Sequence, residues 1–206
     1  MGLRHFIKRW RTSRGFGVHS PFAFEMITKV LRQYDDHYYA YAEVDAFCPR
    51  GRQLGLTDNF TGFDYSIPEA RLLFRLLCYF NPPQVLEVGQ GHEVTYTILT
   101  RAVPHASRLR WIADRPADIA PEGTLFILVN YMSDAIVAQL RQLVLSQMGR
   151  KGGVVVFVRH LQHQASLSIW HEIYAAAPHG IDFNNGHVGL FCGLSGLPRQ
   201  SYELDF

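Results

Sequence analysis

The sequence predicts an α/β protein with a doubly wound, mostly parallel sheet of about six strands that ends in an antiparallel hairpin. Two observations carry this prediction. Short apolar runs alternate along the chain with longer segments of helical periodicity, which is the pattern of strands connected by helices. Near the end, two short, mostly apolar runs at 181–183 and 187–192 flank Asn184-Asn185-Gly186, and an Asn-Gly pair between two such runs indicates a hairpin.

The segment 84–100 forms the centre of the predicted sheet. Residues 85–88 have the character of a strand, Gly89-Gln90-Gly91 forms a turn, and a helix is predicted from Glu93. Strand, glycine turn and helix open a nucleotide-binding unit, because glycines let a ligand approach the backbone and a helix N-terminus offers N–H groups to an anion. A tight turn that binds nothing is an equally open interpretation of this stretch alone.

The other elements follow from start signals and apolar runs. Ser20 and Pro21 predict a helix start, with the serine as N-cap and the proline in the first turn. Ser66 and Glu69 form a capping box for a helix that stops at Asn81. Further strands are predicted at 109–113, 124–129 and 153–158, further helices at 134–148 and 164–177, and a short edge strand at 202–206.

We divide the chain into a helical extension with a loop, residues 1–65, and a sheet-containing unit, residues 66–206, within one globular body. Apolar residues of the basic segment 1–14 fall on one helical face, at Leu3, Phe6, Ile7 and Trp10. We interpret this face as packed on its own domain or on a second copy, so a homodimer stays open. A membrane- or nucleic-acid-binding helix is the alternative. Segment 49–62 is rich in glycine and is predicted to be a mobile loop.

Composition indicates a folded cytoplasmic protein. Hydrophobic residues make up 48% of the 206 residues, which is enough for one sizeable core. Three widely spaced cysteines without a C-x-x-C motif indicate free thiols in a reducing compartment. No signal peptide or membrane-spanning stretch is evident. A net charge of +2 gives no support for nucleic acid, so we predict a small molecule or a protein as partner, and neither nucleic acid nor a membrane.

These features resemble class I S-adenosylmethionine-dependent methyltransferases, which have a Rossmann-like sheet, and in particular a bacterial O-methyltransferase-like group. The stretch Leu86-Glu87-Val88-Gly89 matches the strand and turn that open this family's cofactor site. The Asn-Gly hairpin matches the family's reversed last strand. Three further segments resemble members of the group: Gly17-Val18-His19-Ser20-Pro21-Phe22, Tyr38-Tyr39-Ala40-Tyr41 and Trp170-His171-Glu172-Ile173. The resemblance covers nearly the whole chain, and Gly17 to Phe22 is its most specific part.

The resemblance implies where S-adenosylmethionine would bind. The glycine turn with Gly89 and Gly91 would hold the methionine end, next to Glu87 on the strand. Asp114, after the second strand, would hold the ribose hydroxyls. In metal-dependent members, acids after two later strands hold a divalent ion that orients a catechol-like acceptor.

The chain departs from this family pattern at four places, all on the ligand face. Glu93 stands at the third glycine position, where its carboxylate would repel that of the cofactor. The ten residues from Asp114 to Gly123 are too few to build the adenine loop. Asn130 and Arg159 follow the two later strands in place of acids, and a hard divalent cation needs oxygen ligands. We therefore predict no metal at this face.

His160 and His163 are spaced to lie on one helical face, but no third ligand is evident, and we interpret them as surface histidines. The predicted function is that of a shortened methyltransferase-family protein with degraded cofactor and metal sites, acting as a non-catalytic binding or assembly module. Its affinity for S-adenosylmethionine is expected to be on the order of millimolar or lost. An active O-methyltransferase for a small acceptor is one alternative, and a protein that binds a surface or nucleic acid through its basic N-terminus is another.

Overall fold

The computed structural model describes residues 12, 15, 17–33, 38–48, 65–89, 91, 93–112, 119, 122–130 and 134–206. The predicted apolar helix face at the N-terminus, the glycine-rich loop 49–62 and Asp114 lie outside these residues.

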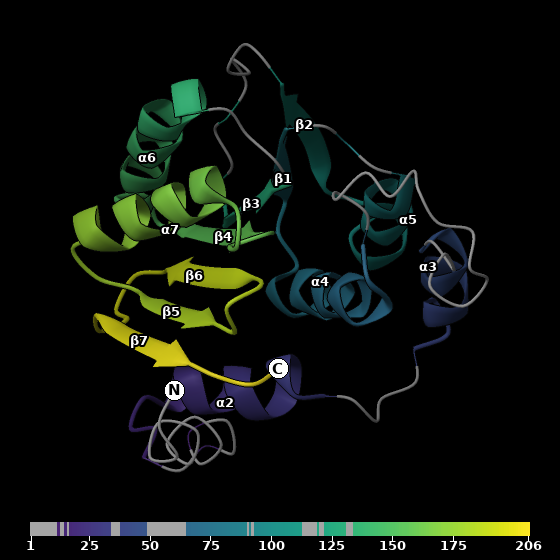
Figure 1. The fold of residues 1–206 in the computed structure, drawn as a ribbon, viewed down its shortest axis with the longest axis horizontal. Coiled ribbons are helices and arrows are strands. Elements are labelled where there is room, and N and C mark those ends of the chain that lie inside the picture. The colour runs from purple at the N-terminus through teal and green to yellow at the C-terminus, as the bar shows by residue number, and fades with distance from the viewer. Residues whose placement is uncertain are drawn as a thin grey trace.

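A seven-stranded sheet forms the centre of the molecule, with the order β2-β1-β3-β4-β6-β5-β7 (Figure 1). Its strands are β1 Gln84–Val88, β2 Ser107–Trp111, β3 Leu125–Val129, β4 Val154–Val158, β5 Ile181–Asn184, β6 Gly189–Gly193 and β7 Gln200–Glu203. The first four strands are parallel, whereas β6 runs antiparallel to both β4 and β5. This confirms the predicted fold class, a Rossmann-like sheet with a C-terminal antiparallel hairpin. The alternation near the C-terminus does add an edge strand, β7, parallel to β5.

Strand β1 lies between β2 and β3. The chain after β2 therefore crosses from one side of β1 to the other before β3 begins, as predicted. No strand other than β1 pairs with β2 in the part of the chain that the structure describes, so β2 is an edge of the sheet.

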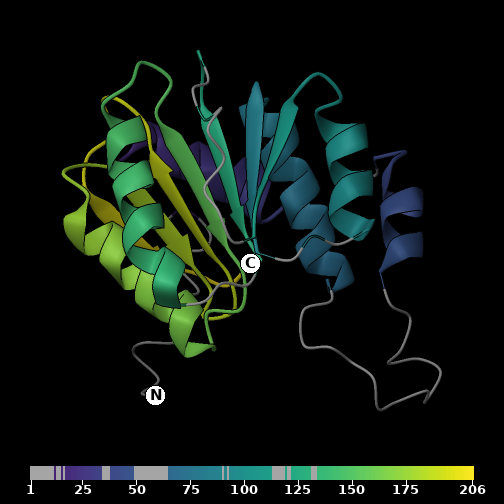
Figure 2. The ribbon, with the colours of Figure 1, turned by 90° about the horizontal axis from the view of Figure 1, so that it is seen from above.

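Helices cover both faces of the sheet (Figures 1 and 2). They are α2 Pro21–Glu25, the π-helix η1 Met26–Leu31, α3 Tyr41–Phe47, α4 Ile67–Phe80, α5 Glu93–Ala102, α6 Asp134–Met148 and α7 Gln164–Ala176. One face packs on α4 and α5, with α3 outside them, and the other packs on α6 and α7. Strands β3 and β4 are buried along their whole length, which explains their unbroken apolar runs.

Alternate residues of these strands enter two hydrophobic clusters, one on each face. Phe126 and Phe157 belong to the cluster under α4, and Ile127 and Val156 to the cluster under α6. The N-terminal elements α2, η1 and α3 contribute to the first cluster. The extension therefore shares its core with the sheet.

Both predicted helix starts are confirmed. The Ser20 hydroxyl accepts a hydrogen bond from the Ala23 N–H at 3.3 Å, and the Ser66 hydroxyl accepts one from the Glu69 N–H at 3.4 Å. Helix α4 ends at Asn81, whose φ of +43° places it in the left-handed region that commonly terminates helices.

The hairpin between β5 and β6 turns through residues 185–188. The Asn185 side-chain oxygen accepts hydrogen bonds from the main-chain N–H groups of His187 and Val188, each at 2.9 Å.

The three cysteines, Cys48, Cys78 and Cys192, are free thiols. None of the described helices is long and apolar enough to cross a membrane.

Candidate functional site at the carboxyl edge of the sheet

The carboxyl ends of β1, β3 and β4 lie side by side at one edge of the sheet. The Asn130 N–H donates to the Val88 carbonyl and the Arg159 N–H to the Val129 carbonyl, both at 3.0 Å. Because parallel strands end at the same edge, these bonds bring the residues after β3 and β4 next to the end of β1. The ends of the three strands that the sequence analysis singles out are therefore neighbours in the fold.

Asn130 links three elements through its side-chain amide. Its nitrogen donates to Glu87 Oε1 at 2.7 Å, and its oxygen accepts from the Tyr65 hydroxyl at 3.0 Å and from Arg159 Nη1 at 3.2 Å. An amide can donate to a carboxylate and accept from a guanidinium at once, whereas a carboxylate can only accept. Asn130 therefore fits this position better than the acid that the family resemblance implies.

Arg159 is buried, with 1% of its side chain exposed. Its Nε donates to Glu69 Oε1 at 2.6 Å, and its guanidinium carbon lies 3.4 Å from the centroid of the Tyr65 ring. The carboxylate of Glu69, in the first turn of α4, balances the buried charge, and the ring supplies a cation–π contact. Arg159, which follows β4, is thus held against Glu69 of α4 and against Tyr65.

Tyr65 extends the network to the helix after the glycine turn. Its hydroxyl accepts a hydrogen bond at 3.2 Å from Thr95, which is buried in the first turn of α5. Burial raises the pKa of the Tyr65 phenol well above its ordinary value. The phenol is therefore neutral and serves as a hydrogen-bonding group.

The glycine turn uses a backbone conformation that favours glycine, but a side chain of the protein lies over it. Gly89 has a φ of +92°, a conformation that favours glycine. A Cβ placed on Gly91 would come within 2.6 Å of the guanidinium carbon of Arg110, so a side chain at this position would require the arginine to shift. Arg110 Nη2 also lies 3.5 Å from Glu87 Oε2. The close approach to the backbone that a ligand would make is made here by Arg110.

Among the predicted cofactor residues, Glu87, Gly89 and Gly91 meet at this edge, whereas Asp114 lies outside the described residues. Glu93 is the first residue of α5, and its side chain is not described. The residues missed by the sequence analysis are Tyr65, Thr95 and Arg110. The sequence held no signal for them, and Arg110 is placed opposite Glu87 by the observed register of β1 and β2.

The expectation that His160 and His163 share a helical face is wrong. Helix α7 begins at Gln164, His163 is its N-cap residue, and His160 has a left-handed φ of +58°. The chain turns after β4 instead of entering a helix, and this turn places the two rings 5.8 Å apart. Burial, followed by the charge of Arg159, lowers the pKa of His160.

The charges of this edge are compensated within the protein. Glu69 pairs with Arg159, and Glu87 contacts both Asn130 and Arg110. The described residues contain no group of three or more His, Cys, Asp or Glu side chains that could hold a metal ion. The side chains around Arg159 do not form a ligand set that fits a divalent cation. The glycine turn has room for a cofactor only if Arg110 moves away from it.

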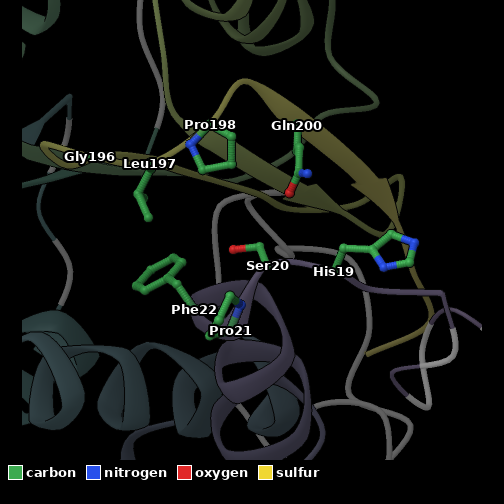
Figure 3. A pocket seen from close by; sticks show the side chains of 8 residues that line it. All are labelled: His19, Ser20, Pro21, Phe22, Gly196, Leu197, Pro198 and Gln200. Carbon is green, nitrogen blue, oxygen red and sulfur yellow. The ribbon is translucent and has the colours of Figure 1, made fainter.

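A hollow of about 440 Å³ lies at the opposite edge of the sheet, between the start of α2 and the loop that leads to β7 (Figure 3). Phe22, Leu197 and Pro198 give it apolar walls, with Ser20 and Gln200 as polar groups. The Ser20 hydroxyl already caps α2. None of the residues that line this hollow belongs to the polar network at the carboxyl ends of β1, β3 and β4.

No family model matches this sequence, and no curated protein matches it. Among solved structures, the chain is similar to the O-methyltransferase TomG from Streptomyces achromogenes, determined in complex with S-adenosylmethionine. The identity is 15%, the alignment covers 78% of this chain and 92% of TomG, and the TM-score is 0.47. A candidate O-methyltransferase from Klebsiella pneumoniae is 10% identical over 79% of this chain and 93% of its own, with a TM-score of 0.49.

Proposed function

We propose that this chain is a methyltransferase-fold protein whose cofactor face is closed by its own side chains, and that it acts as a non-catalytic binding or assembly module. The observation that carries the proposal is the buried Arg159. It occupies the position after β4 where the sequence resemblance implies a metal-binding acid, and it is ion-paired with Glu69 and stacked on Tyr65.

The cost of separating Arg159 from Glu69 opposes the binding of a ligand that would displace this arginine. Breaking a buried ion pair by withdrawing one partner costs about 3–5 kcal/mol. A cofactor or metal that had to displace Arg159 from Glu69 would bear this cost, which weakens binding by roughly a hundredfold to several thousandfold.

Arg110 is a weaker barrier. Its side chain is 56% exposed, and its ion pair with Glu87 is screened by solvent. Displacing it from Gly91 should cost little. An active O-methyltransferase is therefore the second candidate, supported by the turn at Gly89 and by Glu87 at the end of β1. In that case S-adenosylmethionine would bind over the glycine turn without reaching Arg159.

Isothermal titration with S-adenosylmethionine separates the two candidates. We expect a Kd of about 1 mM or weaker for the unaltered protein, and no transfer of a labelled methyl group to catechol with or without Mg²⁺. Arg110→Ala should improve binding only a few-fold, because Arg159 remains in place. Arg108→Ala, on the same strand and the same face, is the matched control and should change nothing. Micromolar binding with methyl transfer would establish the active enzyme instead.

A further inference from the structure

Strand β2 is a lateral edge strand of the sheet, and among the described residues no strand pairs with its outer row of main-chain groups. The Ser107 N–H donates to the Pro83 carbonyl at 2.9 Å, and the Trp111 carbonyl accepts from the Gly89 N–H at 2.8 Å. In a parallel pair, alternate residues direct their main-chain groups to the same neighbour. The N–H and carbonyl groups of Arg108 and Arg110 therefore point away from β1, towards the outer side of the edge.

The side chains along this edge are basic on one face. Arg108 and Arg110 are exposed and align with Val85 and Glu87 of β1, on the α5 side of the sheet. The guanidinium carbon of Arg108 lies 5.2 Å from the ring centroid of Tyr96, which is 67% exposed. Arg110 has a carboxylate neighbour, Glu87, whereas no ion pair joins Arg108 to a carboxylate among the described residues.

We propose that the β2 edge binds an extended, acidic segment of a partner protein as an added strand. Main-chain hydrogen bonds to Arg108 and Arg110 would provide the pairing, and alternate side chains would provide the specificity. Acidic residues two apart on the added strand would lie beside the two arginines, and the apolar residue between them would lie beside Leu109 on the other face. Opposite charges in such cross-strand positions stabilise the pair.

A second copy of this chain fits the edge poorly. Two-fold antiparallel pairing that joins at least three β2 residues of each copy centres on Arg108, Leu109 or Arg110. The first and third registers place an arginine opposite its own copy, and the second places Arg108 opposite Arg110. Like charges directly opposite one another destabilise a strand pair. Charge therefore selects an acidic strand over self-association.

This inference goes beyond the proposed function, because it does not depend on whether the carboxyl edge takes a cofactor. The probe is a fluorescent six-residue peptide with blocked ends, Thr-Glu-Val-Glu-Val-Thr, and its control has lysine in place of both glutamates. We expect the acidic peptide to bind at least about tenfold more tightly than the control, with affinity falling as salt rises. Amide exchange at Arg108 and Arg110 should slow by about tenfold or more at saturation, while Leu109, already paired with β1, should change little.

Two variants of Arg108 separate main-chain pairing from charge. Arg108→Ala and Arg108→Pro remove the same side chain, but only the proline removes the outward N–H, a change that edge strands tolerate. Arg108→Pro should bind at least about threefold more weakly than Arg108→Ala, and Arg108→Glu about tenfold more weakly than the unaltered protein. Thermal unfolding checks that each variant folds, and the exchange of the unaltered protein tests the proposal without any substitution.

Several results would overturn the proposal. Equal binding of the two peptides, or none up to about 1 mM, would leave the arginines as a device against unwanted strand pairing. Dimerisation with slowed exchange at Arg108 and Arg110 would assign the edge to a second copy. Binding of an oligothymidylate that Arg108→Glu abolishes, without slowed amide exchange, would assign it to nucleic acid.

Discussion

The guanidinium carbon of Arg159 lies 3.4 Å from the centre of the Tyr65 ring, so the residue after β4 is stacked on the residue that leads into α4. The same guanidinium donates to both carboxylate oxygens of Glu69, at 2.6 and 3.4 Å. Asn130 connects this pair to Glu87 at the end of β1. The network therefore joins the helix layer to three strands at the edge where other proteins of this general fold bind their ligands.

We expect Arg159→Met to lower the free energy of unfolding by about 3–5 kcal/mol, because it leaves the mostly buried carboxylate of Glu69 without its cation. Urea unfolding at pH 7 measures the change. The double substitution Arg159→Met with Glu69→Gln should recover much of the loss, since it removes both charges. Arg110→Met is the control, because its partly exposed pair with Glu87 is worth less than about 1 kcal/mol. An equal loss in both single variants would contradict a special role for the buried pair.

The fold was predictable from local patterns, because apolar runs and caps act over short distances in the sequence. Ser66 begins α4 and Asn81 ends it, as the capping box and the stop signal predict. The unbroken apolar runs of β3 and β4 predict central strands, and both are fully buried. Ser20 and Pro21 predict a helix start, but not that the chain continues from α2 into the π-helix η1.

The polar network was not predictable, because its members come from distant segments with no shared spacing. In the sequence, Arg159 stands out only as a residue in place of a metal-binding acid, and nothing indicates that it is buried against Glu69. Arg75 is a second case, a charged residue within the apolar pattern of α4. Its Nε donates to the Val30 carbonyl at 2.8 Å, so it satisfies a carbonyl near the end of η1. Such roles depend on which helix and strand ends the fold brings together.

The main chain before β4 should tolerate no side chain at Gly152. A Cβ there would collide with the main chain of Gly123, which leads into β3, and a backbone cannot rotate away as a side chain can. We expect Gly152→Ala to cost about 1–3 kcal/mol, in the range of overpacked sites. Gly149→Ala is the matched control, since its Cβ would lie 3.7 Å from the nearest atom, the Ser146 carbonyl oxygen. Equal urea midpoints for the two variants would disprove the close approach.

Asn130→Asp tests why an amide follows β3. The new carboxylate would lose the hydrogen bond to Glu87 Oε1, now 2.7 Å long, and would face a like charge. The two carboxylates repel each other only when both are ionised, so the variant should lose stability relative to the unaltered protein as pH rises from about 4 to 7. Asn130→Ala removes the contact without adding charge, and its stability deficit should change less with pH. Urea unfolding at several pH values measures both.

Because of Asp182, the free energy of unfolding should fall as pH rises through the acidic range. It lies on β5 with 2% of its surface exposed, and its Oδ2 accepts a hydrogen bond from the Ser201 hydroxyl of β7 at 3.1 Å. Burial raises the pKa of Asp182 to about 6, although the bond from Ser201 acts in the opposite direction. The folded protein therefore holds a proton on this carboxyl at pH values where the unfolded chain has released it.

The sign and size of the effect follow from this difference in pKa. The ordinary value for an aspartate is 3.8, so the stabilisation is complete below that pH and is lost as pH rises towards about 6, after which it is flat. The amount is on the order of 2–3 kcal/mol. Asp182→Asn keeps the shape and removes the titration, so its stability relative to the unaltered protein should rise by that amount between pH 4 and pH 7. Ser201→Ala, which removes the bond to the carboxylate, should raise the pKa further and move the loss to higher pH. A constant difference between Asp182→Asn and the unaltered protein across this range would show that the carboxyl titrates alike in the folded and unfolded chains.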